Sequence, residues 1–71
     1  MKEIKIFTGY ITLGQFLKFI GVVSTGGEIK SFLAENVVFV NENEENRRGK
    51  KLFPGDYVVV FGQKYIIKAE C

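Results

Sequence analysis

The sequence contains no histidine and only one cysteine, Cys71, among its 71 residues. Without histidine, the chain lacks the commonest general base, the commonest zinc ligand and the usual partner of a nucleophilic serine or cysteine. With one cysteine, it can form neither an intramolecular disulfide nor a thiol pair for a structural metal. We therefore expect no catalytic residues, no metal and no cofactor, and we interpret Cys71 as an exposed, incidental thiol.

Long apolar runs are also missing. The longest are four and five residues, Val37 to Val40 and Tyr57 to Phe61, whereas a helix that crosses a bilayer needs about 20 apolar residues. The opening stretch, Met1 to Phe7, interleaves charged and apolar side chains, unlike a secretion signal. We expect a cytoplasmic protein with no membrane partner.

The composition is that of a folded protein, with 46% hydrophobic and 25% charged residues. A chain of this length can bury one small core, so we expect a single domain over residues 1–71 with its function on an exposed face. The net charge of +2 is too small to indicate a polyanionic partner by itself. The distribution of the charges is therefore more informative than their sum.

The first part of the chain predicts a strand and then a helix. Lys2 to Phe7 alternates charged and apolar residues, the pattern of a half-buried strand. Leu13 to Ile20 has apolar residues at helical spacing, and Thr12 with Gln15 has the spacing of a capping box. We expect this helix to end at Gly21.

A second helix is predicted after Thr25, which forms another capping-box pair with Glu28. An apolar stripe begins at Ile29, and Asn36 is suited to a left-handed residue that closes the helix. Both helices are too short to be stable alone, so we expect them to pack on each other and on the following strands.

The remainder of the chain indicates β structure. Pro54 and Gly55 have the chemistry of a type II turn, and Gly62-Gln63 is a two-residue hairpin linker with glycine at its first central position. We expect strands at residues 37–40, 57–61 and 64–68, and a polar loop at 41–51. The predicted fold class is α+β, with two short packed helices against a small, mostly antiparallel sheet.

Gly26 and Gly27 fall in the first turn of the second helix, where glycine lowers helix propensity by roughly 1 kcal/mol per residue. One interpretation is that the missing side chains let a phosphate approach the backbone amides at the helix start, with Lys30 closing on it one turn later. The alternative is that the glycines only permit a tight chain entry or close helix packing. The residues alone do not separate the two.

Four cations lie within six residues in the segment NRRGKK, namely Arg47, Arg48, Lys50 and Lys51. Arginines in such a loop can pair with phosphates or stack on unpaired bases. The alternative is a solvated loop that Glu42 to Glu45 partly neutralise. Nothing in this polar loop would desolvate those carboxylates, so we interpret them as a solvated acidic turn.

The phenylalanines divide into two groups by their predicted positions. Phe16, Phe32 and Phe39 fit core positions by periodicity. Phe19 lies off the stripe of the first helix and Phe53 lies in a turn, so these two are the better candidates for exposed rings that stack on bases.

The segments TLGQFLKFIGVVSTGGEIKSFLAENVVFVN and RRGKKLFPGDYVVV resemble the RNA-binding domain named after ribosomal small-subunit protein four, the alpha-L motif. The resemblance covers Ile11 to Val60, and its form is similar to the small stand-alone YaaA-like bacterial branch. The matching residues are Leu13, Phe16 and Leu17 in the first helix, Ser24 at the start of the second, Val38, Val40 and Asn41 in the strand, and Gly55-Asp56 in the turn.

The resemblance implies a non-catalytic protein that binds structured RNA, ribosomal RNA in particular, with a role in ribosome assembly or translation. Thr12 and Gly26 stand where the family usually has arginines, and Glu42 stands where many members have glycine. This shifts the implied RNA contacts toward the second helix and the loop: Thr25, Gly26, Gly27, Lys30, Arg47, Arg48, Lys50 and Lys51, with Lys18 beside them. The alternative is a protein-interaction module that docks a partner on the last strand, residues 64–68, or on an apolar patch.

Overall fold

The computed structural model describes residues 1–70, so the interpretation of Cys71 lies outside the described residues. Residues 1–70 form two helices and seven strands, and several of the strands are only two residues long. In chain order they are β1 (Lys2–Ile6), β2 (Ile11–Thr12), α1 (Leu13–Phe19), α2 (Gly26–Glu35), β3 (Val38–Val40), β4 (Asn43–Glu44), β5 (Lys51–Leu52), β6 (Tyr57–Val60) and β7 (Gln63–Ala69).

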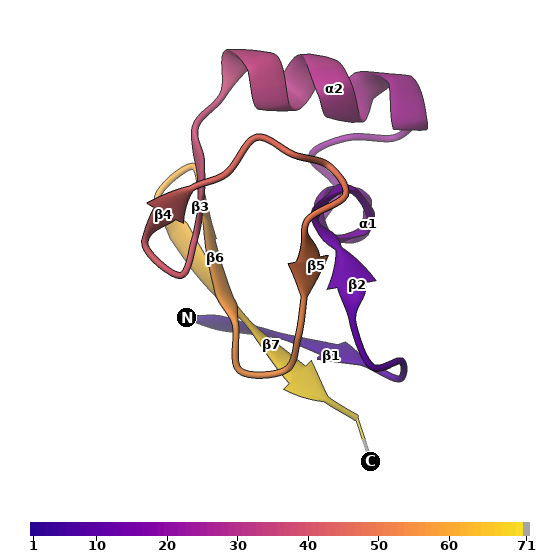
Figure 1. The fold of residues 1–71 in the computed structure, drawn as a ribbon, viewed down its shortest axis with the longest axis vertical. Coiled ribbons are helices and arrows are strands. Elements are labelled where there is room, and N and C mark those ends of the chain that lie inside the picture. Colours follow the sequence, from indigo (N-terminus) through magenta and orange to yellow (C-terminus); the bar gives the residue numbers. More distant parts are fainter. Residues whose placement is uncertain (71) are drawn as a thin grey trace.

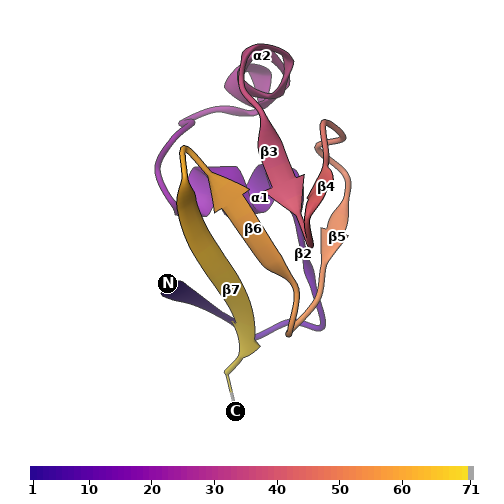
Figure 2. The same cartoon turned by 90° about the vertical axis from the view of Figure 1, so that its left-hand side faces the viewer.

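Five strands form the main sheet in the order β1-β7-β6-β3-β4, and β2 pairs with β5 in a separate two-stranded ribbon. Among the strand pairs of the described residues, the β1–β7 pair alone is parallel and the others are antiparallel. Figure 1 shows the ribbon below α1, with α2 at the opposite end of the molecule from the end of β7. In the view of Figure 2, α1 lies behind the sheet and α2 lies above it. The α+β fold with a mostly antiparallel sheet is confirmed.

Both helices begin as predicted. The Thr12 side chain accepts a hydrogen bond from the Gln15 amide and the Gln15 side chain accepts one from the Thr12 amide, and Thr25 and Glu28 make the same reciprocal pair. These contacts satisfy amides that have no acceptor within the helix. The predicted end of the first helix is also close, because Ile20 is its C-terminal cap.

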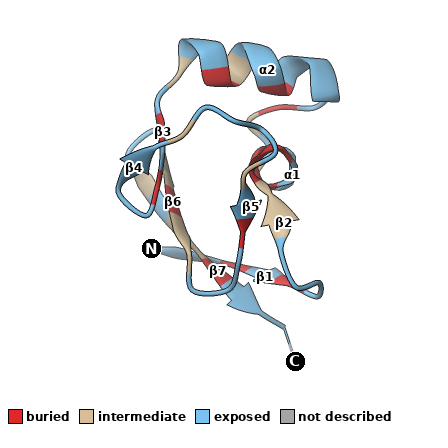
Figure 3. Ribbon diagram, in the orientation of Figure 1, coloured by how far each residue is buried: buried red, intermediate tan, exposed pale blue. Residues whose placement is uncertain are grey.

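The buried side chains form one apolar cluster between the helices and the inner faces of the strands, shown in red in Figure 3. In the first helix Phe16 is fully buried and its ring meets the ring of Tyr65 in β7 edge to face, with centroids 5.3 Å apart. The buried members of the cluster are Ile4, Ile6, Leu13, Phe16, Leu17, Val23, Ile29, Leu33, Val38, Val40, Leu52, Val58, Val60 and Ile67.

Of the three phenylalanines predicted for the core, Phe16 is fully buried, Phe32 packs against the core cluster, and Phe39 is exposed. Phe39 is 40% exposed because β3 buries Val38 and Val40 on its inner face, and the residue between them must face outward. Phe32 is half-buried at the edge of the core, where its ring packs edge to face on the ring of Phe61.

Two predicted turn conformations were wrong. Asn36 is extended (φ −130°, ψ 147°) rather than left-handed, because the chain passes directly into β3; its amide and side-chain nitrogen both donate to the Phe32 carbonyl. In the last hairpin the two central residues are Phe61 and Gly62, both with positive φ, so the glycine occupies the second central position. Positive φ at both positions is the type I′ arrangement that suits tight hairpins. The positive φ expected at Gly55 is present.

The stretch expected to be a polar loop, residues 41–51, also contains regular structure. Its start pairs with β3 as β4, and its end pairs with β2 as β5. The basic segment between them is therefore anchored at both ends.

Candidate nucleic-acid interface

Residues 46–50, called the basic loop below, lie against the start of α1. The amide of Leu13 donates to the carbonyl of Lys50 (2.8 Å), and the amide of Gly14 donates to the carbonyl of Arg48 (2.9 Å). The first amides of α1 are therefore bonded to the loop. Because both contacts use main-chain atoms of the loop, they fix its path while leaving the loop side chains available.

Gly14 makes this close approach possible. A Cβ at this position would lie 3.1 Å from the Ile29 Cδ1 atom and 3.4 Å from the Arg48 carbonyl oxygen. The first distance is tighter than most packing contacts, so a side chain here would force Ile29 of α2 to shift by a few tenths of an ångström and would crowd the basic loop. Sequence reasoning missed Gly14, and the only signal for it was a glycine inside a predicted helix, where glycine is unfavourable.

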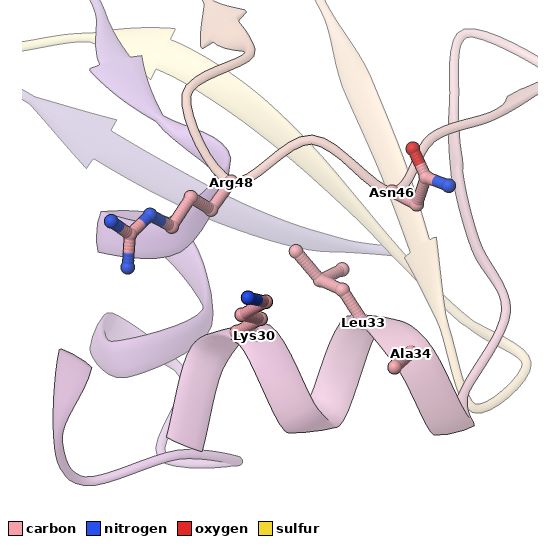
Figure 4. Close-up of a pocket in the computed structure, with 5 residues that line it drawn as sticks. All are labelled: Lys30, Leu33, Ala34, Asn46 and Arg48. Atoms are coloured by element: carbon pink, nitrogen blue, oxygen red, sulfur yellow. The ribbon is translucent and has the colours of Figure 1, made fainter. Parts of the chain in front are cut away.

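Two cations face a hollow of about 420 Å³ between α2 and the basic loop. In Figure 4, Arg48 extends from the loop, Lys30 rises from α2, and Leu33 lies between the helix and the loop. Neither Lys30 nor Arg48 has an acidic partner within 4.0 Å among residues 1–70. The hollow is lined by Lys30, Leu33, Ala34, Asn46 and Arg48.

A second hollow, of about 260 Å³, adjoins the first because Arg48 lines both. It adds Lys18 of α1 to the cations on this side of the molecule. Its lining residues are Thr12, Gly14, Gln15, Lys18, Ile29, Arg48 and Gly49. The structure thus brings together three of the predicted cations, Lys18, Lys30 and Arg48, and we call this region the cationic surface.

Arg47 is held differently from Arg48. Its Nε and Nη2 atoms donate to the two carboxylate oxygens of Glu45 at 2.8 and 3.1 Å, and its amide donates to the same carboxylate at 3.1 Å. The Glu45 side chain is 12% exposed and the Arg47 side chain is 72% exposed. The charge of Arg47 is therefore partly neutralised within the protein, as the acidic run had suggested it could be.

The ion pair shifts both titrations. The hydrogen bond from the Arg47 side chain is the main reason that the pKa of Glu45 falls from 4.5 to about 2, although burial opposes this change. The same hydrogen bond raises the pKa of Arg47. The pair therefore stays charged on both sides over the whole neutral range.

The two lysines of the basic segment also separate. Lys50 is half-buried at the end of the loop. Lys51 is exposed in β5, and its Nζ atom lies 5.0 Å from the centre of the Tyr10 ring. The four cations of the segment thus occupy four different environments. Of these four, Arg48 is the one that lines the hollows beside α1 and α2.

At the start of α2, Gly26 and Gly27 are exposed and no neighbouring atom requires them to lack a side chain. A Cβ at Gly26 would meet nothing within 4 Å, and one at Gly27 would meet only the Thr25 hydroxyl at 4.0 Å. Close helix packing therefore does not explain these glycines, whereas the other alternative, a tight chain entry, stays a prediction. The helix start already has a negative group, because the Glu28 carboxylate accepts from the amides of Ser24 and Thr25 at 2.7 and 3.0 Å.

The residues of the strand and turn motifs connect two turns of the sheet. The Asn41 side chain donates to the Asp56 carboxylate (3.0 Å) and accepts from the Tyr57 amide (3.0 Å). The other oxygen of Asp56 accepts from the Phe53 amide (2.8 Å). Asn41 and Asp56 therefore hold the β3–β4 and β5–β6 connections in place beside the ribbon, which gives both motif residues a structural role.

The family model described as S4 domain matches residues 4–68, nearly the whole chain. The chain belongs to the S4 domain family. The RNA-binding family that the sequence resembled is thereby shown, and in this S4 domain three cations without an acidic partner among residues 1–70 gather on α1, α2 and the basic loop.

This S4 domain is also similar to a curated Bacillus subtilis (strain 168) protein named "Probable ribosome maturation protein RlbA". The two are 52% identical over 59 residues, a match that covers 83% of each chain.

Two other structural observations concern metal sites and membrane-spanning helices. Within residues 1–70 there is no group of three or more histidine, cysteine, aspartate or glutamate residues placed to hold a metal ion. Neither described helix is long and apolar enough to span a membrane.

The docking strand suggested for a protein partner is not available. β7 lies between β1, which pairs with residues 65–69, and β6, which pairs with residues 63–66, so the middle of the last strand has no free edge. An apolar groove of about 640 Å³ does lie between β1 and α1, with Phe7, Tyr10 and Phe19 among its lining residues.

Proposed function

We propose that this S4 domain, as a single domain over residues 1–71, binds structured RNA without catalysing a reaction, and that its target is ribosomal RNA during ribosome maturation in the cytoplasm. The observation that carries the proposal is the pair of adjoining hollows in which Lys18, Lys30 and Arg48 gather without acidic partners among residues 1–70. The printed name of the 52% identical Bacillus subtilis relative supports the ribosomal context.

The mechanism follows from the chemistry of these groups. Arg48 can pair with a phosphate through two parallel hydrogen bonds, whereas Lys18 and Lys30 act as compact point charges. A folded RNA presents phosphates at spacings set by its shape, so three cations fixed on rigid elements select shape more than sequence. Gly26 and Gly27 are exposed beside Thr25, and their main-chain amides offer a neighbouring site for a further phosphate, although the Glu28 carboxylate at the same helix start opposes it.

Lys51 extends the same interface along the ribbon, and Lys50 supports it from a half-buried position. Arg47 contributes less than its charge suggests, because it already binds Glu45. The proposed phosphate contacts are therefore about four: Lys18, Lys30, Arg48 and Lys51.

The test is a salt titration with purified bacterial ribosomal RNA. If about four phosphates are neutralised, the logarithm of the association constant should fall with the logarithm of salt concentration with a slope of about −3.6 on the duplex value, and less steeply on single strands. Filter binding or fluorescence anisotropy measures this slope. An affinity that does not depend on salt, or no binding at low salt, would contradict the proposal.

The apolar groove beside β1 supports a second candidate, a protein-interaction module. This groove is larger than either hollow of the cationic surface, and three of its lining side chains are exposed aromatics, Phe7, Tyr10 and Phe19. Purification at low salt separates the two candidates. RNA that is released from the protein by high salt supports the first, whereas a stoichiometric protein partner that high salt does not remove supports the second.

A further inference from the structure

Two aromatic rings lie side by side on the outer face of the β2–β5 ribbon. Ile11 pairs with Leu52 and Thr12 pairs with Lys51 in this ribbon. Continued by one residue, the same register places Tyr10 opposite Phe53, and their ring centres are 5.6 Å apart. Because side chains alternate between the two faces of a strand, these rings share their face with Thr12 and Lys51, opposite the buried Leu52.

The fold does not bury this aromatic pair. Tyr10 is 42% exposed and Phe53 is 48% exposed, although each could contribute substantially to a core. Neither is among the partly buried residues that pack against the core cluster. Tyr10 also lines the groove beside β1, but the two rings contact each other rather than the core, and adjacent exposed rings of this kind are typical of a binding surface.

The backbone under Phe53 is held firmly. Its amide donates to the Asp56 carboxylate (2.8 Å) and its carbonyl accepts from the Asp56 amide (2.9 Å). The turn that contains Phe53 is also bonded to β7, because the Gly55 amide donates to the Ile67 carbonyl and the Ile67 amide donates to the Asp56 carbonyl. An aromatic ring on such a turn loses little conformational freedom when it binds a ligand.

The aromatic pair is continuous with the cationic surface. Lys51 connects the aromatic pair to the cationic surface. Its Nζ atom lies 5.0 Å from the centre of the Tyr10 ring. The residue paired with Lys51 across the ribbon, Thr12, lines the hollow that Lys18 and Arg48 also line. Figure 1 shows β2 and β5 side by side, extending downward from α1. Cations that bind phosphates therefore lead directly to rings that can stack on a base.

We infer that Tyr10 and Phe53 form a stacking site for one unpaired nucleobase of the bound RNA, next to the structured part whose phosphates meet Lys18, Lys30 and Arg48. The inference rests on the proposed function. Every base has an aromatic face, so such a site is tolerant of sequence and selects for a base that is free of pairing. The preferred RNA is thus a helix or compact fold that ends in, or bulges out, an unpaired nucleotide.

Ultraviolet crosslinking tests the site in the intact complex. The protein is mixed with purified bacterial ribosomal RNA, irradiated, and digested with trypsin and nuclease. Trypsin cuts after the flanking lysines, which places Tyr10 in the peptide of residues 6–18 and Phe53 in the peptide of residues 52–64. We expect a nucleotide on Tyr10 or Phe53, located by fragmentation. Binding with crosslinks only at other residues would overturn the site but leave the proposed function intact, whereas no binding would overturn both.

Substitution gives an independent measurement. Phe53→Leu should weaken binding of ribosomal RNA by at least about fivefold, the lower end for loss of one base stack, while Phe53→Tyr keeps the affinity. The matched control is Phe61→Leu, because Phe61 is also exposed but lies in the β6–β7 turn. A thermal melt confirms that each variant is folded. Equal affinities for Phe53→Leu and Phe61→Leu would overturn the inference.

Discussion

Replacing Arg48 with alanine should weaken RNA binding far more than removing Arg47, although the two residues are adjacent. Arg48 lines both hollows of the cationic surface and has no acidic partner among residues 1–70. Arg47 is bound to Glu45 through two side-chain hydrogen bonds. An arginine that is already paired releases less of the counterion atmosphere when RNA binds.

The magnitude follows from counterion release. Loss of one phosphate contact makes the slope of log affinity against log salt less steep by about 0.9 on the duplex value. Counterion release from this one contact contributes nothing to the affinity at 1 M salt. At 0.1 M salt it contributes about eightfold, which is the expected difference in affinity between wild type and a variant without the contact. We therefore expect Arg48→Ala to bind about eightfold more weakly at 0.1 M salt and nearly normally at 1 M.

The comparison requires a charge-balanced change at Arg47, because Arg47→Ala alone would leave the Glu45 carboxylate unpaired beside the RNA. The double variant Glu45→Gln with Arg47→Ala removes the whole ion pair, and we expect its affinity to stay within about twofold of wild type. Lys68→Ala controls for net charge, since Lys68 is exposed near the end of β7, a strand end that lies far from α2 in Figure 1.

The assay is fluorescence anisotropy with labelled ribosomal RNA fragments at four or more salt concentrations. The reasoning is refuted if Arg48→Ala has the same salt slope as Lys68→Ala, or if the double variant loses as much affinity as Arg48→Ala. If Arg48→Lys loses less affinity than Arg48→Ala, the positive charge contributes to binding separately from the bidentate geometry of arginine.

Three further predictions concern the supports of the site. The pKa of Glu45 is lowered from 4.5 to about 2, so the stabilisation from its ion pair is complete above about pH 4.5 and is lost as the pH falls toward 2. In urea unfolding, the difference in stability between wild type and Glu45→Gln should shrink over that pH range. A difference that stays constant would refute the ion pair as its source. Gly14→Val should destabilise the fold by about 1–3 kcal/mol, because a side chain there meets Ile29 and the basic loop. The control is Gly26→Ala in open space, which should be neutral or stabilising by up to about 1 kcal/mol. Equal urea unfolding midpoints for the two variants would contradict this prediction. Asp56→Ala should cost about 2 kcal/mol in the same assay, since the Asn41 side chain and the Phe53 amide both lose their acceptor, and an unchanged unfolding midpoint would show that these bonds contribute nothing.

Local features of the fold could be predicted from the sequence because their determinants are close together in the chain. Thr12 with Gln15, and Thr25 with Glu28, fix the two helix starts through contacts three residues apart. The ribbon was missed because β2 and β5 are two residues each, too short to show an alternating pattern. Asn36 was assigned from its intrinsic preference, but the direction of the following strand decided its conformation.

The candidate site was predictable in composition but not in arrangement. The sequence identifies the cations, yet which of them pairs internally depends on the path of the loop after β4. The Glu45 amide is bonded to Val38 in β3 (2.8 Å), and this contact fixes where the Glu45 carboxylate can meet Arg47. The separation of Arg47 from Arg48 therefore depends on the main-chain contacts that this stretch makes with β3 and with α1.

The attachment of the basic loop to α1 has a consequence for how this surface can diversify. The loop is anchored through the carbonyl oxygens of Arg48 and Lys50, groups that every amino acid possesses. Mutation can therefore exchange the Arg48 side chain for one that recognises a different target while the anchor at its base stays in place. The same property suits the domain to protein engineering, because a library of side chains at Arg48 could be screened against new RNAs on an unchanged scaffold.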